Sequence, residues 1–154
     1  YAAGDCTESA DAATGDVKVM ALLPNAYMQG ECAGINMAGV PYAFDRAIPM
    51  NSIGFFGKQV LSAGAYKGET YFHQDETNYK KLFYSDNRLV GFILVGDKLP
   101  AAGDVPAYEK AGIYTRLIRE RLPLDSIDFE LICESPGLMA FSKNARQELL
   151  GGEV

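Results

Sequence analysis

Few side chains in this sequence could act as nucleophiles, general bases or metal ligands. The cysteines Cys6, Cys32 and Cys133 lie far apart and form no Cys-x-x-Cys pair, and His73 is the single histidine. Structural zinc and iron–sulfur sites draw their ligands from close clusters of these residue types. The sequence therefore predicts reduced thiols, no metal site and no redox disulfide. We assign no catalytic residue to this chain.

Other reactive residue types have structural explanations. Asp128 and Glu130 suit the first turn of a helix, where carboxylates are favourable, and no second cluster of ligands accompanies them. His73 lies in a predicted strand, and a surface or structural role is expected for it. Lys80 and Lys81 are expected on a solvated strand face, although an acidic electron carrier could bind such a patch.

The composition excludes several classes of protein. The chain has 154 residues, of which 48% are hydrophobic and 22% are charged, as in an ordinary soluble globular protein. Its net charge of −6 gives no basic patch for nucleic acid or for an anionic membrane surface. The apolar run 90–95 is too short to cross a bilayer. We expect a cytoplasmic protein that binds neither nucleic acid nor membrane.

The glycines do not form a dinucleotide-binding loop. Such a loop needs Gly-x-Gly-x-x-Gly between a strand and a helix, so that backbone amides reach a pyrophosphate. Gly30, Gly34 and Gly39 have the wrong spacing and fall within or at the end of a predicted helix. Gly4 and Asp5, taken alone, indicate a turn.

The elements that must position these residues begin with a helix predicted over residues 24–39. Pro24 suits its start, and Gly39 suits its end. The helix is rich in glycine and alanine and apolar on most sides, and beyond Asn25 at its start its uncharged polar side chains are Gln29 and Asn36. This pattern predicts a buried helix that packs closely on its neighbours.

The following residues read as an antiparallel sheet and helices. Strands are predicted at 51–56, 59–64, 70–74, 79–84 and 88–97. Asp86 and Asn87 tolerate positive φ and predict a hairpin between the last two strands, of which 88–97 is apolar enough to be central. Helices are predicted over about 107–122, from Gly103, Asp104 and Pro106 onward, and from about 125 to Ser135. The fold class is α+β, with about five strands and helices on one face.

Three stretches in this order resemble a known family. They are YAAGDCTE at 1–8, LLPNAYMQGECAGINMAG at 22–39, and KLFY at 81–84 leading into NRLVGFILVGD at 87–97. Together they closely resemble the C-terminal portion of FAD-dependent pyridine nucleotide (disulfide) oxidoreductases. The similarity is greatest to the subgroup with rubredoxin reductase, NADH oxidase and NAD(P)H nitrite reductase. It covers nearly the whole chain and thins after about Ser135.

The resemblance implies one side of an FAD site. In the family, the Asp matching Asp5 accepts a hydrogen bond from a ribityl hydroxyl, and Gly4 lets the backbone pass close to the cofactor. The helix that follows points its N-terminus at the pyrimidine edge of the flavin. Free N–H groups of Asn25 and Ala26 would there stabilise negative charge on the reduced flavin.

The resemblance also implies how the chain is divided and what it binds. Residues 1–45 would be the C-terminal remnant of an FAD-binding domain, 46–145 an α+β interface or dimerisation domain, and 146–154 a frayed tail. The partners would be upstream FAD and NAD(P)H domains, a second copy of the chain and a small electron-carrier protein. FAD would belong to the longer parent, and we expect this chain alone neither to retain it nor to oxidise NADH.

Two alternatives stay open at the level of sequence. One is a free-standing interaction or dimerisation module without redox activity. The other is an unrelated small α+β enzyme acting through Asp5, Asp45 or His73, although no spacing of nucleophile and base supports it.

Overall fold

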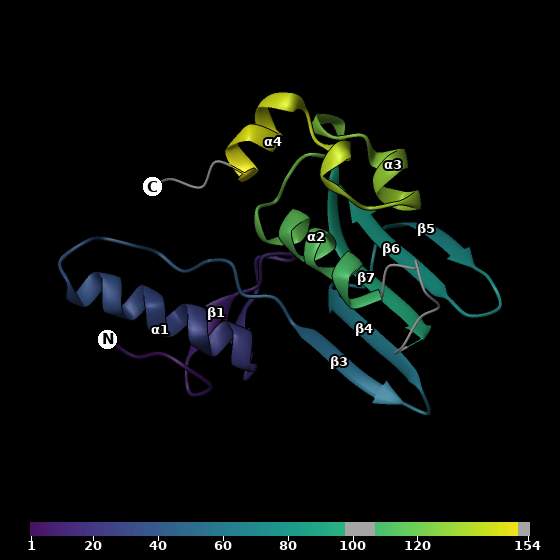
Figure 1. The fold of residues 1–154 in the computed structure, drawn as a ribbon. Helices are drawn as coiled ribbons and strands as arrows, with labels where there is room; N and C mark the ends of the chain where they lie inside the picture. Colours follow the sequence, from purple (N-terminus) through teal and green to yellow (C-terminus); the bar gives the residue numbers. More distant parts are fainter. Residues whose placement is uncertain (98–106, 151–154) are drawn as a thin grey trace.

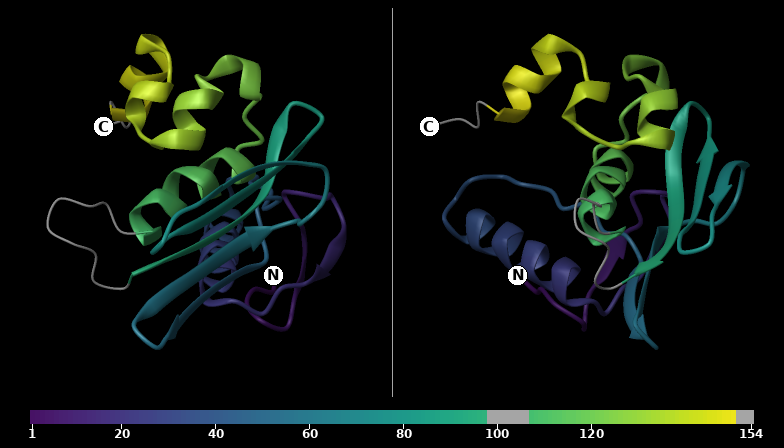
Figure 2. Two further views of the ribbon diagram at one scale, coloured as in Figure 1. Left: turned by 90° about the vertical axis from the view of Figure 1, so that its right-hand side faces the viewer. Right: turned by 45° about the vertical axis from the view of Figure 1, so that its right-hand side comes forward.

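The computed structural model describes residues 1–97 and 107–150 and confirms the predicted α+β fold. Figures 1 and 2 show a five-stranded antiparallel sheet, in the order β3-β4-β7-β6-β5, with the helices on one side. The strands are β3 (Met50–Phe55), β4 (Lys58–Gly64), β5 (Glu69–Gln74), β6 (Tyr79–Ser85) and β7 (Arg88–Asp97). The predicted helix start at 103–106 lies outside the described residues.

Tight turns set the order of the strands. Asp86 and Asn87 both have positive φ, 51° and 61°, which gives the primed turn of a two-residue hairpin and confirms the predicted β6–β7 pairing. Phe56 and Gly57, with φ of 45° and 78°, form a similar turn between β3 and β4. Strand β7 pairs with β4 on one side and β6 on the other, so it is the central strand as predicted.

The β4 and β7 backbones meet closely at two facing glycines. Gly64 lies opposite Gly91 in the register, and the next residue, Ala65, donates its N–H to the Val90 carbonyl at 2.8 Å. A Cβ on Gly91 would come within 3.0 Å of three main-chain atoms of Ala65. Gly64 also has a φ of 76°, which side-chain-bearing residues adopt at a cost. Glycine is therefore required at this crossing.

The core lies between the sheet and α2 (Ala107–Arg119). Leu82 and Phe92 lie opposite one another on β6 and β7 and are buried. The Phe92 ring lies 5.6 Å from the ring of Tyr114 of α2, whose hydroxyl donates to the Ile132 carbonyl at 3.0 Å. The burial of these apolar side chains is the main contribution to the free energy that holds the helices on the sheet.

Aromatic side chains of the sheet and of the β4–β5 connection pack against one another. Phe72 of β5 and Tyr79 of β6 lie 5.4 Å apart by ring centroids. Phe83 contacts Tyr66 at 5.5 Å, and the Lys81 ammonium lies 5.2 Å from the Phe83 ring centroid. These pairs contribute packing to the sheet.

The C-terminal helices differ in part from the prediction. A single helix was expected from residue 125, but a 3₁₀ turn, η1 (Leu124–Ser126), precedes α3 (Phe129–Glu134). Asp128 caps α3 by accepting the Leu131 N–H at 3.0 Å, which confirms its predicted helix-terminal role. Another 3₁₀ turn, η2 (Leu138–Ala140), leads to α4 (Lys143–Leu150).

Helix α1 (Leu23–Met37) forms where it was predicted, but it is not buried. It ends in a Schellman motif, in which the N–H groups of Gly39 and Val40 donate to Asn36 and Ile35. Asn25 and Gln29 are its buried residues, whereas Leu23 and Tyr27 are exposed. The prediction of a buried, closely packed helix is wrong for this chain. The polar stripe faces the rest of the chain, and the apolar sides have no cover among the described residues.

Residues 1–45 join the sheet unit through a few main-chain contacts. Strands β1 (Glu8–Ala10) and β2 (Val17–Val19) form their own two-stranded sheet beside α1 (Figure 1). Asp11 bridges to Ala47, and the Ala12 N–H donates to the Ala47 carbonyl at 2.7 Å.

Arg121 adds a side-chain link between these parts. It follows α2 with a φ of 50°, which ends the helix three residues earlier than predicted. Its guanidinium donates to the Asp45 carboxylate at 2.9 Å, the Asp45 carbonyl at 2.9 Å and the Ala12 carbonyl at 3.3 Å. A left-handed backbone in a non-glycine residue is costly, and these three bonds offset the cost.

Replacing Arg121 by methionine should therefore lower the free energy of unfolding by about 1–2 kcal/mol, because three hydrogen bonds are lost and the backbone strain stays. Arg121→Gly loses the same bonds but relieves the left-handed strain, so it should be milder by about 1 kcal/mol. Urea unfolding followed by circular dichroism measures both variants. Equal stability of Arg121→Met and the wild type would show that the link contributes nothing.

The same link makes part of the stability dependent on acid. The hydrogen bond from Arg121 holds the pKa of Asp45 below its ordinary value of 3.8. The Asp45–Arg121 interaction therefore contributes fully to the folding stability when the pH is above the ordinary pKa of Asp45. This contribution is lost as the pH falls through the lowered pKa. Asp45→Asn should flatten the stability profile below about pH 4.

Candidate functional site

The side chain of Gln29 holds the first residues of the chain against α1. Its Oε1 accepts the Gly4 N–H at 2.7 Å and lies 2.9 Å from the Thr7 hydroxyl. Its Nε2 donates to the Ser9 hydroxyl at 2.5 Å. A single buried amide thus fixes the turn at Gly4 beside the second turn of the helix.

Gly4 and Asp5, two predicted site residues, lie in this turn. Gly4 has a φ of 97°, and the space where a Cβ would project is open. The Thr7 N–H donates to the Gly4 carbonyl at 3.0 Å and closes the turn. Asp5 is exposed, and its carboxylate has no partner among the described residues. The turn therefore presents a carboxylate that is free to accept hydrogen bonds.

Asn25 lies in the first turn of α1 and is fully buried. Its amide group pairs with the main chain of Ile48, donating to the carbonyl at 3.1 Å and accepting the N–H at 3.4 Å. Its own N–H has no partner within the described part of the chain. This arrangement fixes the N-terminal end of the helix to the segment that leads into β3.

The predicted free N–H of Ala26 is not free. It donates to the Leu22 carbonyl at 2.9 Å, because Leu22 stands four residues earlier and already belongs to the helical hydrogen-bond pattern. The helix begins one residue earlier than predicted, which moves the unsatisfied donors toward Asn25.

Gln29 is the positioning residue that the sequence-based assignment of the site missed. The sequence did contain an indication of this role, because Gln29 is one of few polar side chains on a mostly apolar helix. Position alone could not show that it bonds Gly4 and Ser9, which lie 25 and 20 residues away. A cavity of about 140 Å³ lies beside it, between the first nine residues and α1.

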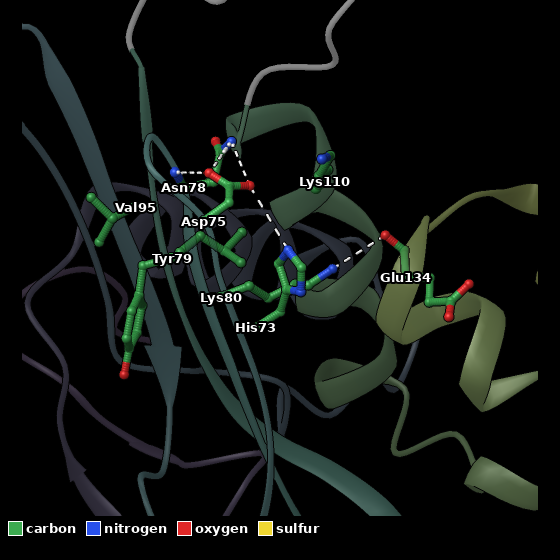
Figure 3. A pocket seen from close by; sticks show the side chains of 9 residues that line it. His73, Asp75, Asn78, Tyr79, Lys80, Val95, Lys110 and Glu134 are labelled. Atoms are coloured by element: carbon green, nitrogen blue, oxygen red, sulfur yellow. Dashed lines mark hydrogen bonds and ion pairs between the residues drawn. The ribbon is translucent and has the colours of Figure 1, made fainter.

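A second cavity, of about 130 Å³, lies between β5, β6 and the helices (Figure 3). Its ionisable groups include His73, Asp75, Lys80, Lys110 and Glu134. The Thr77 and Asn78 N–H groups lower the pKa of Asp75 to about 2, because the carboxylate closes the β5–β6 turn. His73 Nε2 lies 3.8 Å from the same carboxylate. These contacts serve the turn rather than a reaction.

Lys80 departs from its predicted role as a solvated surface residue. Its ammonium donates to the main-chain carbonyls of Cys133 and Glu134 at the C-terminal end of α3. Burial lowers the pKa of Lys80, and burial raises the pKa of the Cys133 thiol to about 11. Lys80 is thus a helix cap, and Cys133 is an unreactive buried thiol. All three cysteines are free in the structure.

The structure does not support a small enzyme built from Asp5, Asp45 and His73. The Asp45 carboxylate is bound by Arg121, and His73 lies on the edge strand β5. The turn that holds Asp5 is bound to α1 through Gln29, and α1 and β5 lie on opposite sides of the molecule in Figure 1. Within residues 1–97 and 107–150, no group of three metal-ligating side chains and no helix able to span a membrane is found.

The comparisons with known proteins agree with the fold. Residues 49–103 match the family model described as rubredoxin NAD+ reductase C-terminal domain. A curated relative, the NADH-dependent phenylglyoxylate dehydrogenase subunit epsilon of Aromatoleum evansii, is 36% identical over 93 residues. The alignment covers 54% of this chain and 22% of that relative, so the match spans about a fifth of the relative's length.

Two solved structures share the architecture. An FAD-dependent pyridine nucleotide-disulphide oxidoreductase from Desulfovibrio vulgaris has a TM-score of 0.67 and 17% identity, covering 97% of this chain and 38% of that one. An NAD-dependent persulfide reductase from A. fulgidus has a TM-score of 0.66 and 19% identity, and the match covers 84% of this chain and 26% of that one. Residues 49–103 are therefore similar to the rubredoxin NAD+ reductase C-terminal domain, and the predicted resemblance of the chain to the C-terminal portion of FAD-dependent pyridine nucleotide-disulphide oxidoreductases is confirmed.

Proposed function

We propose that the chain is the C-terminal part of an FAD-dependent NAD(P)H oxidoreductase. Residues 1–45 would supply the ribityl and pyrimidine side of the FAD site, and 46–145 the interface domain. The names of the relatives support this, because they include an NADH-dependent dehydrogenase subunit and an FAD-dependent oxidoreductase. The remaining FAD and NAD(P)H domains would lie upstream in a cytoplasmic parent protein.

The observation that carries the proposal is the anchoring of the Gly4–Asp5 turn by Gln29. That contact places an exposed, unpaired carboxylate beside the helix whose first turn bears the Asn25 N–H. Open space beside Gly4 leaves room for a ligand to approach the backbone. The residues present therefore fit one side of a flavin and its ribityl chain.

The chemistry of hydride acceptance would come from FAD when it is bound. The chain would contribute binding and electrostatics. Asp5 would accept a hydrogen bond from a ribityl hydroxyl, and the positive end of the α1 dipole, with the Asn25 N–H, would favour negative charge on the flavin pyrimidine. Asn25 and Gln29 would hold these groups in place through their buried side chains.

Removing the Asp5 carboxylate tests the assignment. In a polypeptide that joins this chain to its dinucleotide-binding domains, Asp5→Ala should weaken FAD affinity by about tenfold to a hundredfold, the loss expected for one hydrogen bond to a charged group. Asp16→Ala, at an exposed turn, is the matched control and should leave affinity unchanged. Flavin fluorescence titration measures both. Unchanged affinity in Asp5→Ala would remove Asp5 from the site.

The chain by itself should be colourless and should not oxidise NADH, because the pyrophosphate-binding part of the site lies outside it. Stoichiometric flavin that is bleached by NADH would contradict this part of the proposal. In the proposal, a small electron-carrier protein would be the acceptor for the longer parent and not for this chain.

A second candidate is an interaction or dimerisation module without redox activity. It is favoured by the exposed apolar side chains of α1, among them Leu23, Tyr27 and Met37. Light scattering after size exclusion separates the two. A tight dimer in which residues 1–44 are exchanged between copies would support the module.

A further inference from the structure

A cleft of about 350 Å³ lies between α1 and α2. Met28 of α1 and Ala111 of α2 form part of its wall, and three arginines line it, Arg46, Arg116 and Arg119. The cleft therefore gathers three guanidinium groups in a chain whose net charge is −6. The cleft is separate from the Gly4–Asp5 turn and from the cavity in Figure 3.

Arg119, one of the residues that line the cleft, has an unsatisfied donor. Its Nε is buried and has no hydrogen-bond partner among the described residues, a rare situation in folded proteins. Burial lowers the pKa of Arg119, but a guanidinium stays protonated at any pH where proteins are folded. The side chain is therefore a half-buried positive charge with a free N–H.

The neighbouring charges do not neutralise it. Glu120 accepts the Arg116 Nε–H at 2.8 Å and is the single acidic side chain among the lining residues. Asp45 lies 4.0 Å from Arg46 but already binds Arg121. The cleft thus carries an excess of positive charge from Arg46 and Arg119.

We propose that this cleft binds a small oxyanion, a phosphate or carboxylate group, with Arg119 as its principal ligand. A guanidinium offers two parallel donors that match the oxygens of such groups. The volume exceeds one ion and lies in the range of small-ligand sites, so the Met28 and Ala111 wall would contact the rest of the ligand. The inference does not rest on the flavin assignment.

Thermal unfolding of the chain in Tris chloride tests the site, with ionic strength held constant by sodium chloride. About 10 mM pyrophosphate, phosphate or succinate should raise the Tm by about 2–4 °C if the site is substantially occupied. A shift with the phosphates alone assigns a phosphate group, and a shift with succinate assigns a carboxylate. No shift with any of the three overturns the proposal.

Variants locate the effect. Arg119→Met should abolish the shift in Tm. Arg119→Lys keeps the positive charge but lacks the two parallel N–H donors of the guanidinium, so it should reduce the shift. Arg88→Met, at an exposed strand residue, removes the same charge and should keep the full shift. A shift that survives in Arg119→Met refutes the assignment. If that variant does not fold, the Arg119 Nε–H signal in NMR decides, because it must move on titration of the wild type with pyrophosphate.

Discussion

Replacing Gly91 by alanine should destabilise the chain by about 3–5 kcal/mol, one of the two largest effects of single substitution that we expect. The new methyl group would collide with the Ala65 main chain, which cannot move because its N–H bonds the Val90 carbonyl. A backbone collision in the central strand is not relieved by a change of rotamer. Urea unfolding followed by circular dichroism gives the loss.

The matched control is Gly30→Ala in α1. Nothing lies within 4 Å of the Cβ that it would add, and alanine is the better helix former. This variant should be more stable than the wild type by about 0.5–1 kcal/mol. If Gly91→Ala and Gly30→Ala have similar stabilities, the close approach of β4 and β7 is not as the structure describes.

Replacing Asn25 by leucine should cost about 2–4 kcal/mol. The change leaves the Ile48 carbonyl and N–H buried without partners, and each unsatisfied main-chain group carries a desolvation penalty. Because Asn25 also fixes the first turn of α1, the variant should loosen the place proposed for the flavin. Unfolding by urea measures the stability, and the amide spectrum of residues 23–29 reports the local effect.

Asn36→Leu is a close control, since Asn36 makes the same kind of contact at the other end of the helix. Its amide donates to the Tyr42 carbonyl at 2.7 Å and accepts the Tyr42 N–H at 3.2 Å. These groups are exposed and would bond water in the variant, so the loss should stay below about 1 kcal/mol. Equal losses at Asn25 and Asn36 would mean that burial does not decide the cost.

The sheet was largely predictable from local pattern. Strand β7 could be recognised as central from its unbroken apolar run, and Asp86-Asn87 identified the hairpin because the turn needs positive φ at two adjacent residues. The facing glycines could not be recognised in this way. Gly64 and Gly91 acquire their role from the register of β4 against β7, which no local signal specifies.

The candidate site was predictable in its parts but not in its arrangement. The turn at Gly4 and the start of α1 were recognisable from residue types and from family resemblance. The contact of Gln29 with Gly4 depends on which face of α1 meets the N-terminal residues, and the helix is apolar on most sides. The expected burial of α1 was wrong for the same reason, since hydrophobicity shows that a face needs a partner and not where the partner is.

Arg121 has a consequence for how the chain unfolds. Its guanidinium donates to Ala12 and Asp45, and its main-chain N–H donates to the Ile118 carbonyl in the last turn of α2. Detachment of residues 1–45 would leave Arg121 with a strained backbone and no compensating bonds, and the end of α2 would fray in the same event. We therefore expect both parts to unfold as one cooperative unit, with a single transition. The boundary near residue 45, at which the sequence was divided into 1–45 and 46–145, would then not separate two independently unfolding units.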